Sequence, residues 1–360
     1  MALTIAQIAD TDAGWASIEP SWRALDARRP VRVPFTDPDW CRLWWRHHRR
    51  DTLRAHDELR LFTLSDGPEL VAIAPMMLTR RPGRLPLSAR ELQFFGADRN
   101  LTELRGMLAA PGWEGRAAHA LSAHLASLAG WDWVQWHGLP AEDPPPAIRI
   151  AHTTQDFVLP LGSDWTAFRR GLPRNIRESL RKCYNSLERD GHGWNLRVQQ
   201  GPDAANALPQ LIALHQRRAR QVGMKAHIDI FADPRAPGFL TDFVRQASTA
   251  RLFTLEIGGQ AVAMRLGFAY DDELYLYYSG YDPAWAQYSV MTTVLSEALR
   301  WAIGQGMGRV NLSTGANVSK LRWRPVAIET RSGTQLSSRR RARLANGVVR
   351  ALRQIVRPTS

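Results

Sequence analysis

Three tyrosines and the helix start that follows them form the segment of this sequence best suited to chemistry. Tyr275, Tyr277 and Tyr281 are spaced to share one face of a β-strand, and residues 287–292 open the next predicted helix. A helix N-terminus presents unpaired N–H groups and a partial positive charge, which suits a pyrophosphate. Spacing alone fits two interpretations: an anion site, or half-buried strand residues followed by an ordinary helix cap at Ser289.

Several common catalytic motifs are absent from the sequence. It contains no Gly-x-Ser-x-Gly, no His-Glu-x-x-His and no P-loop. Glycines at positions 304, 306 and 308 follow a predicted helix and precede a strand, which reverses the context of a dinucleotide-binding loop. The ten histidines show no metal-ligand spacing, so we expect no metal site.

Composition indicates a folded and strongly basic protein. The 360 residues fit two domains, and a hydrophobic content of 44% is enough for packed cores. Two cysteines, no signal peptide and no apolar run long enough to span a bilayer lead us to expect a cytoplasmic protein. The net charge of +13 predicts an anionic partner: nucleic acid, a phosphorylated small molecule or an acidic membrane face. A high-GC genome would give the same average charge, but not local clusters.

The two halves of the chain repeat one pattern. Residues 62–72 align without a gap on residues 253–263, each predicted as a strand, a tight turn and a second strand. A predicted helix and a strand follow in both halves, at 114–129 and 131–137, and at 290–303 and 309–313. A unit of this kind that occurs twice indicates a duplicated α/β fold. We place the domain boundary in the proline-rich connection at 140–146.

Two segments concentrate arginine. A predicted helix–break–helix begins at Asp164, and Arg174, Arg177, Arg181 and Lys182 form nearly a stripe along its second helix, which we expect to bind an anionic substrate. From Ser338 to the C-terminus, arginines alternate with apolar residues and no acid occurs. This tail predicts a basic amphipathic helix that lies on anionic lipid, contacts RNA or packs on the protein itself.

The second half resembles a known superfamily in the order of its segments. The matching elements are the arginine-rich helix with Arg177, Arg181 and Lys182; Leu214-His215 followed by Arg218 and Gly223; the hairpin at Gly258; Tyr281-Asp282-Pro283; and Gly315 followed by Ser319-Lys320 and Trp323. Together they resemble the GNAT acyltransferases, in particular the CelD/BcsL-like branch named after cellulose biosynthesis. Related Fem-type peptidoglycan aminoacyltransferases have two tandem GNAT-like domains. The resemblance covers residues 155–325 well and 35–140 weakly.

The resemblance implies a fold class and an activity. The fold is α/β (α+β), with tandem GNAT-like domains, each a mostly antiparallel mixed sheet flanked by helices. A degenerate N-terminal domain is expected at residues 1–145, a catalytic domain at 146–330 and the basic tail at 331–360. The implied reaction moves an acyl group from a thioester, with acyl-CoA as co-substrate, to an amine or hydroxyl of a sugar, polysaccharide or cell-envelope precursor. Apart from the resemblance, composition leads us to expect a cytoplasmic location, and the basic tail predicts peripheral contact at the inner face of the membrane.

The resemblance also implies roles for single residues. A base must accept the nucleophile's proton, for which His215 and Asp282 are the candidates, and Tyr277 or Tyr281 would protonate the leaving thiolate. Lys320 would hold an anionic group or the oxyanion. The expected catalytic residues are His215, Tyr281, Asp282 and Lys320; the expected cofactor-binding residues are Gln287, Tyr288, Ser289, Thr292 and Gly315; and the expected substrate-binding residues are Arg177, Arg181, Arg218, Tyr277 and Trp323.

The sequence departs from the family at the phosphate-binding loop. Residues 287–292 contain no glycine, whereas GNAT loops usually read Gln/Arg-x-x-Gly-x-Gly/Ala. Side chains at Val290 and Met291 would hinder the close approach of a phosphate to the backbone. Two alternatives therefore stay open: a Fem-type transferase that takes aminoacyl-tRNA, and a non-catalytic protein with a decayed site that binds membrane or nucleic acid.

Overall fold

The chain divides into two compact units, one made of residues 1–154 and 329–360 and the other of residues 155–328. The computed structural model describes residues 2–83, 88–220, 229–339 and 342. The amphipathic helix predicted from Ser338 therefore lies almost entirely outside the described residues. Residues 331–336, which the predicted tail at 331–360 includes, belong to a strand of the first unit. Across the described ranges, no helix combines the length and apolar character needed to cross a membrane.

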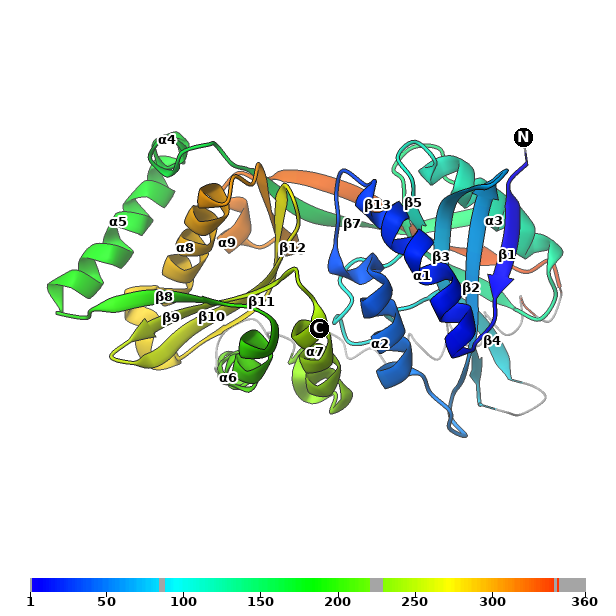
Figure 1. Cartoon of the computed structure of the whole chain (residues 1–360), viewed down its shortest axis with the longest axis horizontal. Coiled ribbons are helices and arrows are strands. Elements are labelled where there is room, and N and C mark those ends of the chain that lie inside the picture. The colour runs from blue at the N-terminus through cyan, green and yellow to red at the C-terminus, as the bar shows by residue number, and fades with distance from the viewer. Residues whose placement is uncertain (1, 84–87, 221–228, 340–341, 343–360) are drawn as a thin grey trace. The chain divides into compact units, whose positions relative to one another are not determined.

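The first unit is a mixed sheet with helices (Figure 1). Its strands lie in the order β1-β2-β3-β4-β6-β13, and β5 pairs with β3; only the β4–β6 pair is parallel. The bounds are β1 (Thr4–Ile8), α1 (Asp12–Ala27), η1 (Pro34–Thr36), α2 (Pro38–His48), β2 (His56–Asp66), β3 (Glu69–Arg81), β4 (Ala89–Phe94), β5 (Leu108–Ala109), α3 (Glu114–Ser127), β6 (Trp133–Leu139) and β13 (Val326–Leu336).

The second unit has the same order of strand types. Its strands lie in the order β8-β9-β10-β11-β12-β7, and only the β11–β12 pair is parallel. The bounds are β7 (Ile148–Pro160), α4 (Trp165–Gly171), α5 (Arg174–Arg189), β8 (Trp194–Gln199), α6 (Gly201–Ala219), η2 (Ile230–Ala232), α7 (Arg235–Gln246), β9 (Ala250–Ile257), β10 (Gln260–Ala269), β11 (Glu273–Tyr281), η3 (Pro283–Tyr288), α8 (Val290–Gly304), β12 (Arg309–Thr314) and α9 (Val318–Leu321).

The predicted fold class is confirmed. In each unit a three-strand antiparallel meander leads through a helix, α3 or α8, to a strand that lies parallel to the meander's last strand. A strand from elsewhere in the chain then pairs antiparallel with that parallel strand, β13 in the first unit and β7 in the second. The predicted hairpin at 253–263 is present, and Gly258 and Gly259 at its turn both have a positive φ.

Local signals explain several helix ends. The Asp164 carboxylate accepts a hydrogen bond from Ala167 N at 2.6 Å and so caps α4 as predicted. Leu172 and Pro173 separate α4 from α5, because proline disfavours helical geometry in the residue before it.

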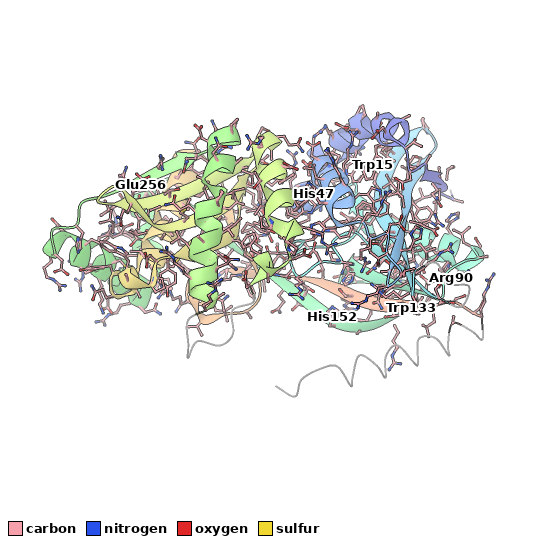
Figure 2. The ribbon with its side chains drawn as sticks, turned by 90° about the horizontal axis from the view of Figure 1, so that it is seen from below. Trp15, His47, Arg90, Trp133, His152 and Glu256 are labelled. Carbon is pink, nitrogen blue, oxygen red and sulfur yellow. The ribbon has the colours of Figure 1, made fainter. Side chains whose placement is uncertain are left out.

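In the first unit, the start of β6 is fixed by buried contacts: Trp133 Nε1 donates to Glu91 at 3.1 Å, close to Arg90 (Figure 2).

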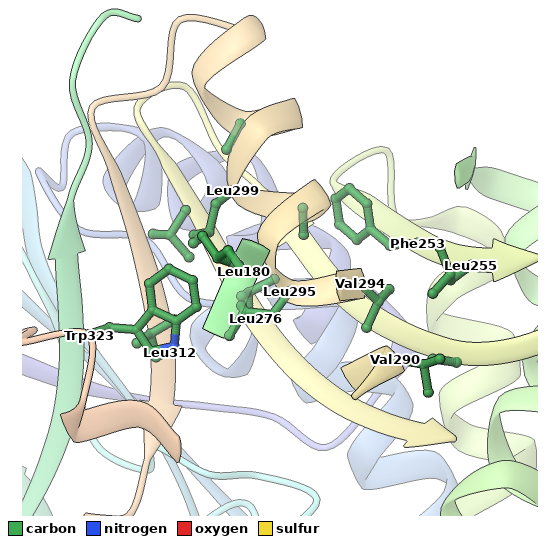
Figure 3. Close-up of a cluster of buried hydrophobic side chains, with 14 of the residues drawn as sticks. Leu180, Phe253, Leu255, Leu276, Val290, Val294, Leu295, Leu299, Leu312 and Trp323 are labelled. Carbon is green, nitrogen blue, oxygen red and sulfur yellow. The ribbon is translucent and has the colours of Figure 1, made fainter. Parts of the chain in front are cut away.

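The core of the second unit lies between its sheet and the helices α5 and α8. Leu180 of α5, Val294 of α8 and Leu276 of β11 belong to one cluster of buried apolar side chains (Figure 3). Trp323, which follows α9, belongs to the same cluster and is 1% exposed. The helices α6 and α7 pack on each other, and α6 also packs on β10 and β11.

Candidate functional site

The parallel strands β11 and β12 pair over only a short length. Glu273–Tyr275 lie opposite Arg309–Asn311, and the pairing stops there. On its other side β11 carries a β-bulge, because Leu276 and Ser279 lie opposite Gly267 and Arg265 of β10. Tyr277 and Tyr278 of β11 therefore lie opposite the single residue Leu266 of β10. The strand that leads to α8 is bent away from the regular ladder at this point.

The bulge corrects one prediction. Because side chains alternate along a strand, the extra residue moves Tyr281 to the opposite face from Tyr275. Tyr281 packs against the core beneath α8, whereas Tyr277 and Tyr278 contact each other with ring centroids 4.3 Å apart. The prediction that Tyr275, Tyr277 and Tyr281 share one face is wrong, and the physical reason is the inserted residue.

His215 lies in the interior beneath the bulge. Its side chain is 0% exposed, its Nδ1 lies 3.2 Å from the Ser279 carbonyl oxygen, and its ring meets Tyr278 edge-on. The helix α6 approaches β11 so closely that a Cβ on Gly280 would lie 2.3 Å from His215 N. This geometry suits a residue that positions the bulge, since a bound substrate cannot reach a fully buried ring.

Asp282 and Arg218 lie at the end of β11 nearer the surface. The Asp282 carboxylate accepts hydrogen bonds from Ala284 N and from Arg217, both at 3.1 Å. Among the described residues, the buried Nε of Arg218 has no hydrogen-bond partner. Burial lowers the pKa of the Arg218 guanidinium, and nearby Tyr281 acts in the opposite direction. A desolvated cation of this kind is stabilised by a bound anion.

The start of α8 differs from an ordinary capped helix. Ser289 has a φ of 53°, in the left-handed region, and its side chain makes no capping hydrogen bond. The interpretation of Ser289 as an ordinary cap is therefore wrong. Val290 is fully buried, and Met291 packs against the core, so the two side chains expected to hinder an approaching phosphate point inward. Gln287 remains exposed.

Tyr288 is held inside the protein by two polar partners. Its hydroxyl donates to Asp190 at 3.1 Å and lies 3.0 Å from His192 Nε2. Burial raises the pKa of Tyr288, and the hydrogen bond to Asp190 acts in the same direction. The phenol therefore stays protonated and fixes the loop before α8. Asp190 and His192 were not predicted from the sequence, where nothing marks them as neighbours of Tyr288.

Lys320 contacts the end of β12, and Thr292, in the first turn of α8, contacts the turn that follows α9. Lys320 Nζ donates to the Thr314 carbonyl oxygen at the end of β12, directly before Gly315, which has a φ of 90°. The turn after α9 brings Arg322 to α8, where its Nη2 donates to Thr292 Oγ1 at 3.2 Å. Within the described part of the chain, the buried Arg322 Nε has no hydrogen-bond partner.

Arg322 is the functional candidate that the sequence did not reveal. The sequence did place Arg322 two residues after the predicted site residue Lys320. It gave no reason to prefer Arg322 over Arg324, which flanks Trp323 on the other side. The structure brings together Thr292, Gly315, Lys320 and Arg322 at the start of α8 and the end of β12. These residues are called the α8 cluster below.

Besides Arg218, the predicted substrate-binding residues separate into two groups. Arg177 and Arg181 are exposed and, with Arg169, Arg170 and Arg174, line a hollow of about 400 Å³ between α4 and α5, where Glu178 provides the single acid. This arginine hollow has the charge expected for an anion site. Trp323 and Tyr277 lie instead in the interior, at 1% and 5% exposure, and so support the core.

The first unit closes the equivalent place with its own chain. Strands β4 and β6 also pair over three residues, 91–93 with 133–135. Beyond that point Arg105 donates to the carbonyl oxygens of Phe94 and Phe95, at 2.9 and 3.1 Å. The following glycine and Gly138 allow the backbones to touch, because a Cβ on Gly138 would lie 2.5 Å from the Arg105 carbonyl oxygen.

Comparisons with known proteins relate part of this chain to a domain family and the whole chain to solved folds. Residues 174–321 match the model of the acetyltransferase (GNAT) domain. No curated protein matches the chain. The chain is similar in structure to FemX, at 9% sequence identity and a TM-score of 0.59, with 98% of this chain and 99% of that one covered. A conserved protein of unknown function from Bacteroides thetaiotaomicron gives 11% identity, a TM-score of 0.51 and coverage of 93% and 100%. These likenesses show the fold, and the CelD/BcsL branch stays a prediction.

Proposed function

We propose that this chain, whose residues 174–321 form a GNAT-type domain, transfers an acyl group from a thioester to an amine or hydroxyl. Acyl-CoA is the proposed donor, and a sugar, polysaccharide or cell-envelope precursor is the proposed acceptor. The observation that carries the proposal is the α8 cluster, which gathers a lysine, an arginine and a helix start where β11 and β12 part.

The α8 cluster has the properties of a donor phosphate site. The first N–H groups of a helix attract anions, and Arg322 lies against the first turn of α8 with a buried Nε that no described residue satisfies. Among the described residues no group of histidine, cysteine or acidic side chains could hold a metal ion. Arginine and backbone N–H groups are therefore the proposed phosphate ligands, and they replace the missing glycine loop.

The proposed chemistry assigns one role to each of three half-buried polar residues, Tyr281, Asp282 and Lys320. The acceptor nitrogen or oxygen attacks the thioester carbon, a C–N or C–O bond forms, and the C–S bond breaks. Asp282 accepts the proton of the nucleophile, and Tyr281 donates a proton to the departing thiolate. Lys320 stabilises the oxyanion that forms between these steps. His215 holds the bulge of β11, on which Tyr281 and Asp282 depend.

Direct measurement of donor binding tests the proposal. Acetyl-CoA and longer acyl-CoAs are titrated into the protein by calorimetry, and free thiol is then followed with a panel of amino sugars and sugar alcohols. We expect saturable binding and thiol release that requires an acceptor. The proposal fails if neither acyl-CoA binding nor thiol release is detected.

A Fem-type reaction with aminoacyl-tRNA is the second candidate. The arginine hollow and the absence of glycine from residues 287–292 favour it, since both suit a larger polyanion than CoA. Activity that disappears after ribonuclease treatment would support this candidate. If no transfer occurs with either donor while an anionic ligand still raises the melting temperature, the remaining alternative is a binding protein with a decayed site.

A further inference from the structure

Exposed aliphatic side chains are concentrated on α9 and the first residues of β13. Seven large apolar residues are exposed among those described, and four of them lie within residues 318–328. Val318 is 80% exposed and Val326 is 57% exposed, while Leu321 and Ile328 complete the group. Isolated exposed apolar residues are common on protein surfaces, but several within one short segment mark a candidate binding surface. This group is called the aliphatic face.

The four residues form two pairs, one on α9 and one on β13. Val318 and Leu321 are three apart on α9, and Val326 and Ile328 are two apart on β13, so each pair shares a side of its element. The segment is held to the second unit by side-chain hydrogen bonds, because Lys320 bonds to β12 and Arg322 to α8. The aliphatic face is therefore presented by an ordered part of the second unit.

Basic residues predominate in the segment that carries the aliphatic face. Lys320, Arg322 and Arg324 lie within the same segment, and no aspartate or glutamate occurs from residue 298 to residue 328. Arg324 is exposed. Glu329, which is exposed, directly follows Ile328 and is the first acid after this segment. Apolar side chains in a segment with an excess of basic residues complement an anionic lipid surface, which offers hydrocarbon and negative head groups together.

We propose that residues 318–328 dock on an anionic membrane, with Val318, Leu321, Val326 and Ile328 inserted among the lipids. Each inserted side chain leaves water, which is favourable in proportion to its exposed apolar area. Lys320 lies on the same four-residue helix as Val318, so docking brings the α8 cluster to the lipid surface. The inference does not depend on the proposed acyl transfer, because it concerns binding alone.

Sedimentation with vesicles tests the proposal on the full chain. The probes are vesicles of equimolar phosphatidylcholine and phosphatidylglycerol, and vesicles of phosphatidylcholine alone. We expect binding to the anionic vesicles and at least a tenfold loss in the Val318→Asp, Val326→Asp double variant. Leu53→Asp is the matched control, because Leu53 is 86% exposed but lies in the first unit, and it should bind as the original protein does.

The double variant and the anionic vesicles each have an outcome that overturns the proposal. One is unchanged binding of the double variant, which would assign membrane contact to another part of the chain such as the basic tail. The other is the absence of any binding to anionic vesicles, as expected if the aliphatic face contacts a protein instead. Equal binding to both kinds of vesicle would also contradict the role of the basic residues.

A labelling experiment covers the case in which the double variant does not fold. Both native cysteines, Cys41 and Cys183, are buried, so a Val318→Cys variant can be labelled selectively with a fluorophore sensitive to polarity. Its emission should shift to the blue when anionic vesicles are added, and a labelled Leu53→Cys control should not respond. No shift at position 318 in vesicle-bound protein would overturn the proposal.

Discussion

Arg322 donates a hydrogen bond from Nη2 to Thr292 Oγ1 at 3.2 Å and so joins the turn after α9 to the first turn of α8. The two residues are thirty positions apart. Their contact places a guanidinium at a helix N-terminus, where two sources of positive potential add. The donor site proposed above depends on this contact.

Arg322→Ala should weaken donor binding about tenfold, which corresponds to about 1.4 kcal/mol. The variant loses the cation at the start of α8 while Thr292 and the helix remain. Calorimetric titration with acyl-CoA measures the effect. Arg300→Ala is the matched control, because Arg300 is exposed near the other end of α8. Equal affinities of the two variants would remove Arg322 from the proposed site.

Lys320→Ala should reduce acyl transfer at least tenfold, or about 1.4 kcal/mol of transition-state stabilisation. The fold should persist, because the Lys320 side chain is only half-buried at the end of β12. Lys320→Arg keeps the positive charge and should retain more activity than the alanine variant. The measurement is kcat/KM together with the melting temperature, and wild-type turnover in Lys320→Ala would contradict the assignment.

Alanine at both Arg177 and Arg181 should weaken binding of an anionic substrate with little change in stability. Both side chains are exposed on α5 and line the arginine hollow. Substrate affinity should also fall as salt rises, since exposed charges are screened over about 8 Å at physiological ionic strength. Affinity measured across a salt series checks this. An affinity independent of salt, or a large fall in melting temperature, would count against the prediction.

Gly280→Ala should lower the free energy of unfolding by about 1–3 kcal/mol, the usual cost of overpacking. A Cβ at this position would lie 2.3 Å from His215 N, so α6 would have to move away from β11. Gly304→Ala is the control, since nothing lies within 4 Å of its Cβ. Urea unfolding measures both variants. Equal stabilities would show that the contact between α6 and β11 is not tight.

His137 should make the first unit less stable in acid. Burial, aided by the positive charge of Arg105 and by His152, lowers the pKa of His137 from 6.5 to about 3. Between these two values the unfolded chain binds a proton that the folded protein does not, so the free energy of unfolding falls as pH decreases through this window. His137→Gln should show a smaller decrease, measured by unfolding at a series of pH values. Identical slopes for the two proteins would contradict the buried neutral histidine.

Sequence patterns predicted the elements of this protein because their signals are local. The Asp164 cap, the break at Pro173 and the glycine turn at 258–259 each depend on residues within a few positions of one another. The repeated hairpin then indicated two related units, and the strand order of each unit agrees with this interpretation. The fold class could therefore be predicted from short-range chemistry and one internal repeat.

The candidate site was decided by tertiary structure, because its contacts join residues that are distant in the chain. One inserted residue in β11 moved Tyr281 to the other face, and no alternation pattern records such a bulge. Packing of α6 on Gly280 buried His215, and the core beneath α8 enclosed Trp323, although both have side chains suited to a surface site. Arg322 gained its place only when α9 folded against α8. The sequence determined which side chains exist near the site, and long-range packing determined which of them can meet a substrate.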